Sequence, residues 1–166
     1  MNELLSLSQS HKKQGIVVDT NILLLLIVGL TDVNCITSFK RTAQFTNEDY
    51  YVLQNALSLF DVHLVTPHIL SEASNLMGHS ASPPPPVLRA NLRQIIFQCK
   101  EFVRESAVLA QRREFLQFGI ADAGIAELAT GGAVVLTDDS QLYHYLSGVG
   151  GSAVNFNHLR TYAKDL

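Results

Sequence analysis

The sequence predicts an α/β fold with three layers, α/β/α, in which helices cover both faces of a central parallel sheet. Two observations carry this prediction. Short apolar stretches at residues 15–18, 62–65 and 133–136 are typical of buried parallel strands. Segments with the helical spacing of apolar residues separate these stretches, and an alternation of strands and helices forms a parallel sheet with both faces covered.

The composition predicts a single folded domain over residues 1–166. Hydrophobic residues make up 47% of the chain and charged residues 16%, which disfavours a disordered chain. The formal net charge of -3 provides no overall basic field of the kind that attracts nucleic acid. This argument against a nucleic-acid substrate is weak, because an acidic metal site can coexist with arginines that bind phosphate elsewhere.

The remaining composition predicts a soluble, cytoplasmic protein. Cys35 and Cys99 lie far apart without a Cys-x-x-Cys spacing, which favours reduced thiols in a reducing compartment. Residues 1–14 lack the ordered regions of a signal peptide. The clean apolar run at residues 22–30 has nine members, whereas a membrane-spanning helix needs about 20, so no membrane association is expected.

The first predicted strand runs directly into a polar triplet, Asp19-Thr20-Asn21. Thr20 or Asn21 can cap a following helix that uses residues 22–28 and ends near Gly29. Ligands of open α/β sheets gather beyond the carboxyl ends of the strands, so Asp19 lies where chemistry is usually done. Two further helices are predicted in this part of the chain, at residues 2–13 and 47–60.

The second predicted strand is followed by a helix-start signal, Thr66-Pro67. Threonine is a good N-cap and proline is best tolerated in the first helical position, so a helix containing Glu72 is predicted over Pro67–Met77. Four consecutive prolines then predict a stiff connector within residues 79–86. A spacer and a docking segment for a proline-recognition module are both compatible with this connector.

A long amphipathic helix is predicted between Leu88 and Leu109. A solvated helix face explains most of the cations on and beyond its polar side. Four of them are candidates for contact with a nucleic-acid strand, namely Arg89, Arg93, Arg112 and Arg113.

The last third of the chain repeats the pattern of helix, strand and polar strand end. A helix rich in small residues is predicted over residues 119–129, with Asp122 near its start. The third apolar strand runs into Thr137-Asp138-Asp139. The elements predicted after it are a helix at 141–146, a strand at 152–156 and a helix from Asn157.

Acidic residues recur near the carboxyl ends of the predicted strands and in the helices next to them. Asp19 follows the first strand, and Glu72 lies in the helix after the second. Asp138 and Asp139 follow the third strand, and Asp122 lies in the helix that leads to it. A parallel sheet brings these positions to one rim, where carboxylates repel one another unless they are protonated or neutralised by a cation. Oxygen ligands without paired His or Cys suit a hard metal ion, Mg²⁺ or Mn²⁺.

Four motifs resemble those of the PIN-domain nucleases, and they occur in that family's order over residues 18–156. Each motif alone is weak, whereas four in sequence are specific. The motifs are Val-Asp-Thr-Asn at 18–21, Ser-Glu at 71–72, Ile-Ala-Asp-Ala-x-Ile-x-x-x-Ala at 120–129 and Val-Leu-Thr-x-Asp at 135–139.

The resemblance implies a set of metal-binding acids and of polar groups that support them. The acids are Asp19, Glu72, Asp122 and Asp139, with Asp138 as the substitute for its neighbour. The supporting groups are Thr20, Asn21 and Thr137. The 52 residues between the first two acids exceed the spacing of compact bacterial members, which implies an insertion at about residues 31–50.

The activity that the resemblance implies is hydrolysis of phosphodiester bonds in single-stranded RNA, with Mg²⁺ or Mn²⁺ as the cofactor. A nuclease of this kind leaves a 3′-hydroxyl and a 5′-phosphate. A free-standing domain of this size is also compatible with the toxin of a toxin–antitoxin pair, which implies an antitoxin partner and a homodimer. The alternative is a catalytically silent PIN-fold module that binds RNA or a protein.

Other chemistries of α/β folds fit the sequence less well. A haloacid-dehalogenase-type phosphatase needs Asp-x-Asp after its first strand, and here Asn21 replaces the second acid. A response-regulator receiver needs a late lysine after a strand, where Lys164 does not fit. Neither a phosphate-binding Gly-x-x-x-x-Gly-Lys loop nor a dinucleotide-binding Gly-x-Gly-x-x-Gly motif occurs.

Two further polar residues are each compatible with a structural role and with a functional one. His68 lies one turn before Glu72 and is a candidate for phosphate contact. Asn155 could line the rim, but termination of the last strand is the preferred interpretation.

Overall fold

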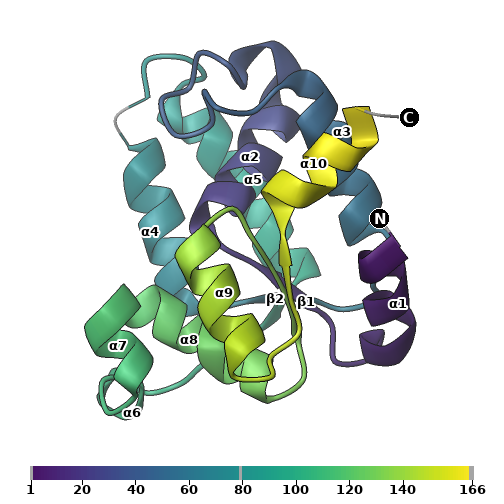
Figure 1. Ribbon diagram of the computed structural model, residues 1–166. Coiled ribbons are helices and arrows are strands. Elements are labelled where there is room, and N and C mark those ends of the chain that lie inside the picture. The colour runs from purple at the N-terminus through teal and green to yellow at the C-terminus, as the bar shows by residue number, and fades with distance from the viewer. Residues whose placement is uncertain (1, 79, 165–166) are drawn as a thin grey trace.

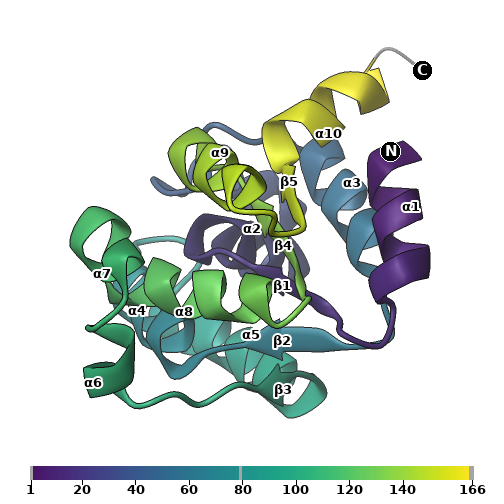
Figure 2. The same cartoon turned by 60° about the horizontal axis from the view of Figure 1, so that its bottom comes forward.

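The sheet has its first strand at its centre. A computed structural model describes residues 2–78 and 80–164 (Figure 1), and in them five parallel strands lie in the order β3-β2-β1-β4-β5 (Figure 2). The strands are β1 (Ile16–Val18), β2 (His63–Val65), β3 (Lys100–Glu101), β4 (Val134–Thr137) and β5 (Ala153–Asn155).

Helices flank this sheet on both sides and complete a three-layer α/β/α arrangement (Figure 2). Outside residues 85–118, the order of helices and strands along the chain matches the alternation that the sequence predicts. The helices are α1 (Asn2–His11), α2 (Thr20–Thr31), α3 (Asn47–Leu57), α4 (Pro67–Met77), α5 (Pro85–Gln98), α6 (Ser106–Leu109), α7 (Arg113–Phe118), α8 (Ile120–Thr130), α9 (Ser140–Gly148) and α10 (Phe156–Lys164).

The most apolar helix, α2, is also the most buried one. It packs against α3, α4 and α5, so nearly every side chain between Ile22 and Val28 is removed from water. This position explains why the segment shows a continuous apolar run rather than the one-sided pattern of a surface helix. Because Asp19 immediately precedes α2, the packing of this helix fixes the location of that carboxylate.

The structure confirms four of the predicted strands, which are β1, β2, β4 and β5. It also confirms the predicted helix Pro67–Met77. Thr66 caps this helix, with its hydroxyl 3.3 Å from the backbone nitrogen of Ile69, and Pro67 occupies its first turn. A capping box between Thr46 and Asp49 begins α3 where its acidic first turn predicts a helix start.

Two predicted boundaries are wrong, whereas α2 ends at Thr31, near Gly29 as predicted. Asp19, rather than Thr20 or Asn21, is the N-cap of α2. The connector predicted over 79–86 is shorter than expected, because α5 begins at Pro85. Prolines fit the first turn of a helix, where the backbone nitrogens have no intrahelical acceptor.

The long helix predicted between Leu88 and Leu109 is also wrong. The chain leaves the helical path at Cys99, and Lys100 and Glu101 pair in parallel with Leu64 and Val65 to form the edge strand β3. Two short helices, α6 and α7, follow. The apolar spacing is misleading here because some of the residues that produce it are exposed, including Val103 at 69% of its surface.

The segment between α2 and α3, which covers residues 32–46 and is called the 32–46 loop below, contains a 3-10 turn and several hydrogen-bonded turns. It lies within the region where an insertion is expected. In the part of the chain that the structure describes, every helix is too short or too polar to cross a bilayer.

Candidate functional site

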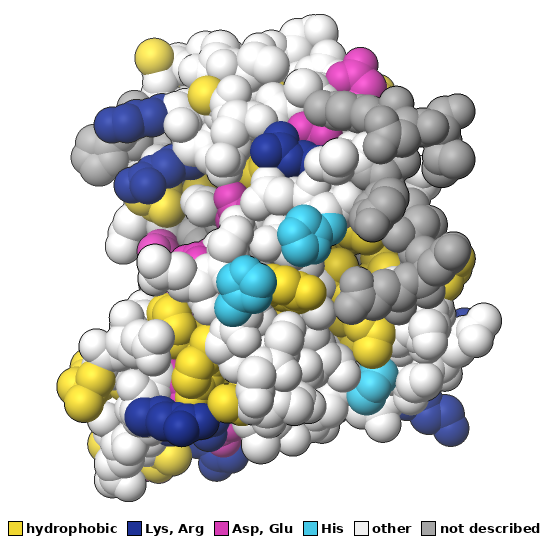
Figure 3. Space-filling view, in the orientation of Figure 1, with side chains coloured by type: hydrophobic (Ala, Val, Ile, Leu, Met, Phe, Trp, Pro, Cys, Tyr) yellow, Lys and Arg dark blue, Asp and Glu magenta, His cyan; other side chains and the backbone are white. Residues whose placement is uncertain are grey.

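The four predicted acids line one hollow of about 590 Å³ beside the carboxyl ends of β1 and β4. On the same face of the molecule, acidic side chains gather below a pair of basic patches (Figure 3). The residues that line the hollow are Asp19, Thr20, Asn21, Arg41, His68, Ser71, Glu72, Asn75, Leu76, Phe118, Gly119, Ile120, Ala121, Asp122, Asp139 and Leu142.

Asp19 is held by hydrogen bonds on both carboxylate oxygens. Its Oδ1 accepts from the backbone nitrogen of Ile22 at 2.9 Å, which is the N-cap contact of α2. Its Oδ2 accepts from the Thr137 hydroxyl and from the backbone nitrogen of Asp138 at 3.0 Å. Only 6% of the residue is exposed. The adjoining ends of β1 and β4 therefore place one carboxylate firmly at the edge of the hollow.

Thr137 links Asp19 to the next acid. Its oxygen accepts from the backbone nitrogen of Asp139 at 2.9 Å while its hydroxyl hydrogen points to Asp19. The Oδ1 of Asp139 caps α9, accepting from the nitrogens of Gln141 at 2.7 Å and Leu142 at 3.1 Å. This chain of contacts fixes the geometry of two acids with one buried hydroxyl.

The adjacent acids Asp138 and Asp139 have different surroundings. Asp139 lines the hollow, whereas Asp138 is absent from its lining. Both oxygens of Asp138 accept from side-chain amides, namely Asn21 at 3.3 Å and Gln44 at 2.7 Å. Asp138 thus ties the 32–46 loop to the triplet after β1, and Asn21 contacts Asp138 rather than one of the four acids.

Glu72 reaches the hollow from α4. Residues 68, 71, 72 and 75 of this helix all line it, as expected for positions three and four apart on one helical face. The Oε2 of Glu72 accepts from the Thr20 hydroxyl at 2.7 Å. Thr20 therefore orients Glu72, and His68 lies on the wall where a phosphate contact is predicted.

Asp122 enters from the first turn of α8, opposite Glu72. The helix follows Gly119, whose φ of 93° is a conformation that glycine adopts without strain. Burial raises the pKa of Asp122 to about 7, and the charges of Asp139 and Glu72 act in the same direction. Those two acids are thus close enough to Asp122 to disfavour its ionisation.

The pKa of Asp19 is raised as well. Burial, followed by the charge of Asp138, raises the pKa of Asp19 to about 8, although hydrogen bonds from Thr137, Ile22 and Asp138 act in the opposite direction. Burial is the main cause of both raised pKa values, and the charges of neighbouring carboxylates add to it. A bound cation would reverse both shifts.

The donor chemistry of the hollow fits a hard divalent cation, because all four acids and both threonine partners present oxygen. Among residues 2–78 and 80–164, no group of three or more His, Cys, Asp and Glu side chains is arranged to hold a metal ion directly. Mg²⁺ usually keeps several water ligands and takes one or two carboxylates. The residues present therefore fit an ion that is coordinated in part through water.

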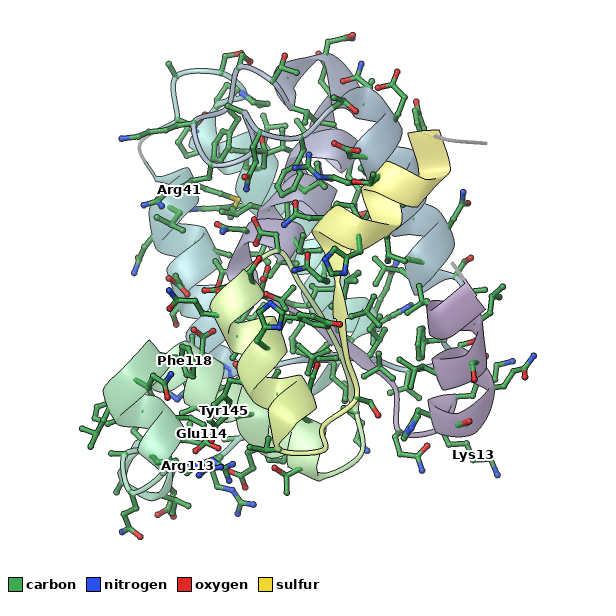
Figure 4. All side chains as sticks on the ribbon, in the orientation of Figure 1. Lys13, Arg41, Arg113, Glu114, Phe118 and Tyr145 are labelled. Atoms are coloured by element: carbon green, nitrogen blue, oxygen red, sulfur yellow. The ribbon has the colours of Figure 1, made fainter. Side chains whose placement is uncertain are left out.

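Arg41, on the 32–46 loop, is the arginine that sequence reasoning missed. It lines the upper part of the hollow in the view of Figure 4, and Phe118 lies on the lower side. The signal was the pair Lys40-Arg41 within a stretch that has no periodicity. Such a pair predicts two exposed cations, but it does not predict that one of them lines the hollow.

The four arginines considered from the sequence are absent from the lining of this hollow. Arg112 instead forms an ion pair with Glu114 at 3.1 Å, and the Arg113 guanidinium lies over the Tyr145 ring, 5.2 Å from its centre (Figure 4). Asn155 is buried at the end of β5, and its Oδ1 accepts from the Asn157 nitrogen at 2.9 Å, in line with the preferred structural role.

Comparisons with protein-family models, with curated proteins and with solved structures each returned no match to this chain.

Proposed function

We propose that this protein is a hydrolase, a Mg²⁺- or Mn²⁺-dependent endoribonuclease that cleaves phosphodiester bonds of single-stranded RNA. The observation that carries the proposal is the convergence of Asp19, Glu72, Asp122 and Asp139 from four elements on one hollow. The resemblance of the same residues to PIN-domain motifs supports it independently of the geometry.

In this proposal the four acids hold the cation, directly or through water. When bound, the ion would lower the pKa of a water molecule and offset charge on the phosphate. Thr137 keeps Asp19 in place through its hydroxyl, and Thr20 does the same for Glu72. The acids act as ligands and orienting groups, and water rather than a side chain attacks the phosphorus.

Arg41 gives the hollow a cation on its rim that none of the four acids neutralises by an ion pair within the described residues. A phosphodiester that enters the hollow would meet this guanidinium beside the acids. Arginine suits that role because its planar fork donates two parallel hydrogen bonds to phosphate oxygens.

The test compares RNA cleavage by the wild type with that by Asp19→Asn, Glu72→Gln and Asp122→Asn. With Mn²⁺, we expect the wild type to cleave single-stranded RNA and each variant to be slower by about a hundredfold or more. EDTA should abolish cleavage. The matched control is Asp61→Asn, since this exposed carboxylate pairs with Lys12 at 3.3 Å and does not line the hollow. Equal cleavage by the wild type and Asp19→Asn would refute the proposed site.

A catalytically silent module that binds RNA or a protein is the second candidate. The lack of three preassembled metal ligands among the described residues favours it. RNA retained by the wild type without cleavage in either Mg²⁺ or Mn²⁺ would support this candidate over a nuclease.

The biological role that we propose for the nuclease is that of a toxin paired with an antitoxin protein, with a homodimer as the active form. Expression of the wild type should then arrest growth, and expression of Asp19→Asn should not. Relief of the arrest by a small protein encoded beside this gene would support the pairing, and unimpaired growth with active nuclease would argue against it.

A further inference from the structure

A second hollow adjoins the acidic one and has the opposite charge. It has a volume of about 450 Å³ and contains two cations, three serines and no acid among its described lining residues. The lining consists of Ser38, Phe39, Lys40, Arg41, Leu76, Ser80, Ala81 and Ser82.

Two residues belong to the walls of both hollows. Arg41 and Leu76 line the acidic hollow and the second one, so the two spaces are neighbours across these side chains. Acids are thus concentrated on one side of Arg41, and cations with hydroxyl groups lie on the other. This is the charge pattern expected for a strand whose reacting phosphate lies among the acids while the next phosphates lie among donors.

The 32–46 loop presents its cations from an anchored backbone. Thr42 is fully buried and donates to the Ile36 carbonyl at 2.7 Å, and Phe39 and Phe45 are buried beside it. At the far end of the loop, Arg160 donates to the Gln44 carbonyl at 2.8 Å, and Gln44 donates to Asp138 at 2.7 Å. Because both ends of this segment are tied down, little ordering is needed on binding.

Lys40 and Arg41 themselves are available for a ligand. Both are exposed, and neither forms an ion pair with any residue in the described part of the chain. Four other cations, Lys12, Arg104, Arg112 and Arg160, each pair with a carboxylate. The two cations of the second hollow therefore differ from these in having no ion-pair partner among the described residues.

We propose that Lys40 and Arg41 bind successive phosphates of single-stranded RNA in the second hollow, with Ser80 and Ser82 as hydroxyl donors. The strand then runs from the acidic hollow past Arg41 along the 32–46 loop. This inference rests on the proposed function for its substrate class, but it concerns binding and needs no cleavage.

The test measures RNA binding in EDTA, where no hydrolysis is expected. A fluorescently labelled single-stranded oligouridine is titrated with the protein, and the dissociation constant is followed by fluorescence anisotropy between about 50 and 200 mM salt. We expect Arg41→Ala and Lys40→Ala each to weaken binding about fivefold at low salt. Each should also reduce the slope of log affinity against log salt by about 0.7, which corresponds to one lost phosphate contact on a single strand.

Two matched controls remove the same charge elsewhere. Lys100 on β3 and Lys13 after α1 are exposed and absent from the lining of both hollows, and Figure 4 places Lys13 far from Arg41. Lys100→Ala and Lys13→Ala should leave the salt slope unchanged. Arg41→Lys should restore the slope, and thermal unfolding of every variant checks the fold. If Arg41→Ala and Lys40→Ala match these controls, or if the wild type does not bind RNA, the inference is wrong.

The same variants separate this inference from the nuclease proposal. If the wild type cleaves RNA with Mn²⁺ but Arg41→Ala keeps the full salt dependence of RNA affinity, the nuclease proposal stands and the second hollow does not bind the RNA. If no condition yields cleavage but the salt slope falls in Arg41→Ala and Lys40→Ala as expected, RNA binding in the second hollow is supported and the nuclease proposal fails.

Discussion

At the scale of single residues, the fold makes two acids of the acidic hollow harder to ionise than they are in the unfolded chain. Asp19 and Asp122 are carboxylic acids whose pKa values are raised to about 8 and about 7 by burial and by neighbouring acids. The ordinary value of such a side chain is 3.8. The folded state therefore binds more protons than the unfolded state throughout the range between these values.

This difference fixes the direction of a pH effect. Because the folded state holds the extra protons, the free energy of unfolding contributed by these two groups is greatest below pH 3.8 and falls as pH rises through 7 and 8. In EDTA, we expect the denaturation midpoint to be lower at about pH 8.5 than at about pH 6. Urea denaturation at both pH values measures it.

The variant Asp19→Asn/Asp122→Asn should reduce that pH dependence, and Asp61→Asn should keep it. A wild-type midpoint that rises with pH over this range would contradict the raised pKa values.

The scale of residues also shows why the four acids were predictable and Arg41 was not. Each acid lies directly after a strand or near the start of a helix, so the topology alone assigns it to the rim. Arg41 lies in a loop without periodicity, and its position depends on long-range contacts such as that between Gln44 and Asp138, 94 residues apart in sequence. Local patterns do not encode contacts of that kind.

At the scale of elements, α3 approaches α2, the helix that follows Asp19, very closely at Gly29. A methyl group built on Gly29 would lie 2.2 Å from the Tyr50 ring, well inside contact distance. The glycine allows α3 to approach α2 where any larger residue would separate them.

We therefore expect Gly29→Ala to lower the free energy of unfolding by about 1–3 kcal/mol, despite the better helix propensity of alanine. Chemical denaturation measures this change. The matched control is Gly148→Ala in α9, because a methyl group there meets nothing within 4 Å. This control should be neutral or slightly stabilising, by about 0.5 kcal/mol. Equal stability of Gly29→Ala and the wild type would show that α3 shifts without cost.

The elements also differ in how far the sequence predicts them. β1, β2 and β4 are buried between helices, and a buried parallel strand has a strong apolar signature. The edge strand β3 has two exposed residues, and its only strand-like feature is its backbone pairing with Leu64 and Val65. Pairing across 36 positions leaves no local pattern, so the helical spacing before and after β3 hides it.

At the scale of the whole molecule, ligand binding and folding are linked through the acidic hollow. Its walls come from α2, α4, α8 and the end of β4, so a cation held there would bridge elements that separate on unfolding. A ligand present at a hundred times its dissociation constant stabilises the folded state by about 2.7 kcal/mol.

We expect saturating Mn²⁺ to raise the melting temperature of the wild type by about 5–10 °C at pH 8. Asp19→Asn and Glu72→Gln should show a smaller rise, and Asp61→Asn should show the full rise. Differential scanning calorimetry with and without EDTA measures the effect. The same rise in all four proteins would locate the bound ion outside the acidic hollow.

The central position of β1 has a consequence for the order in which the chain matures. Synthesis proceeds from the N-terminus, so β1 is made before its neighbour β4. The contact between Asp19 and Thr137 spans 118 residues. A nascent chain that lacks β4 has Asp19, Glu72 and Asp122 but neither the hydroxyl that holds Asp19 nor Asp139. The acidic hollow is therefore completed only after β4 and Asp139 have been synthesised, so a chain that stops before them carries an incomplete site.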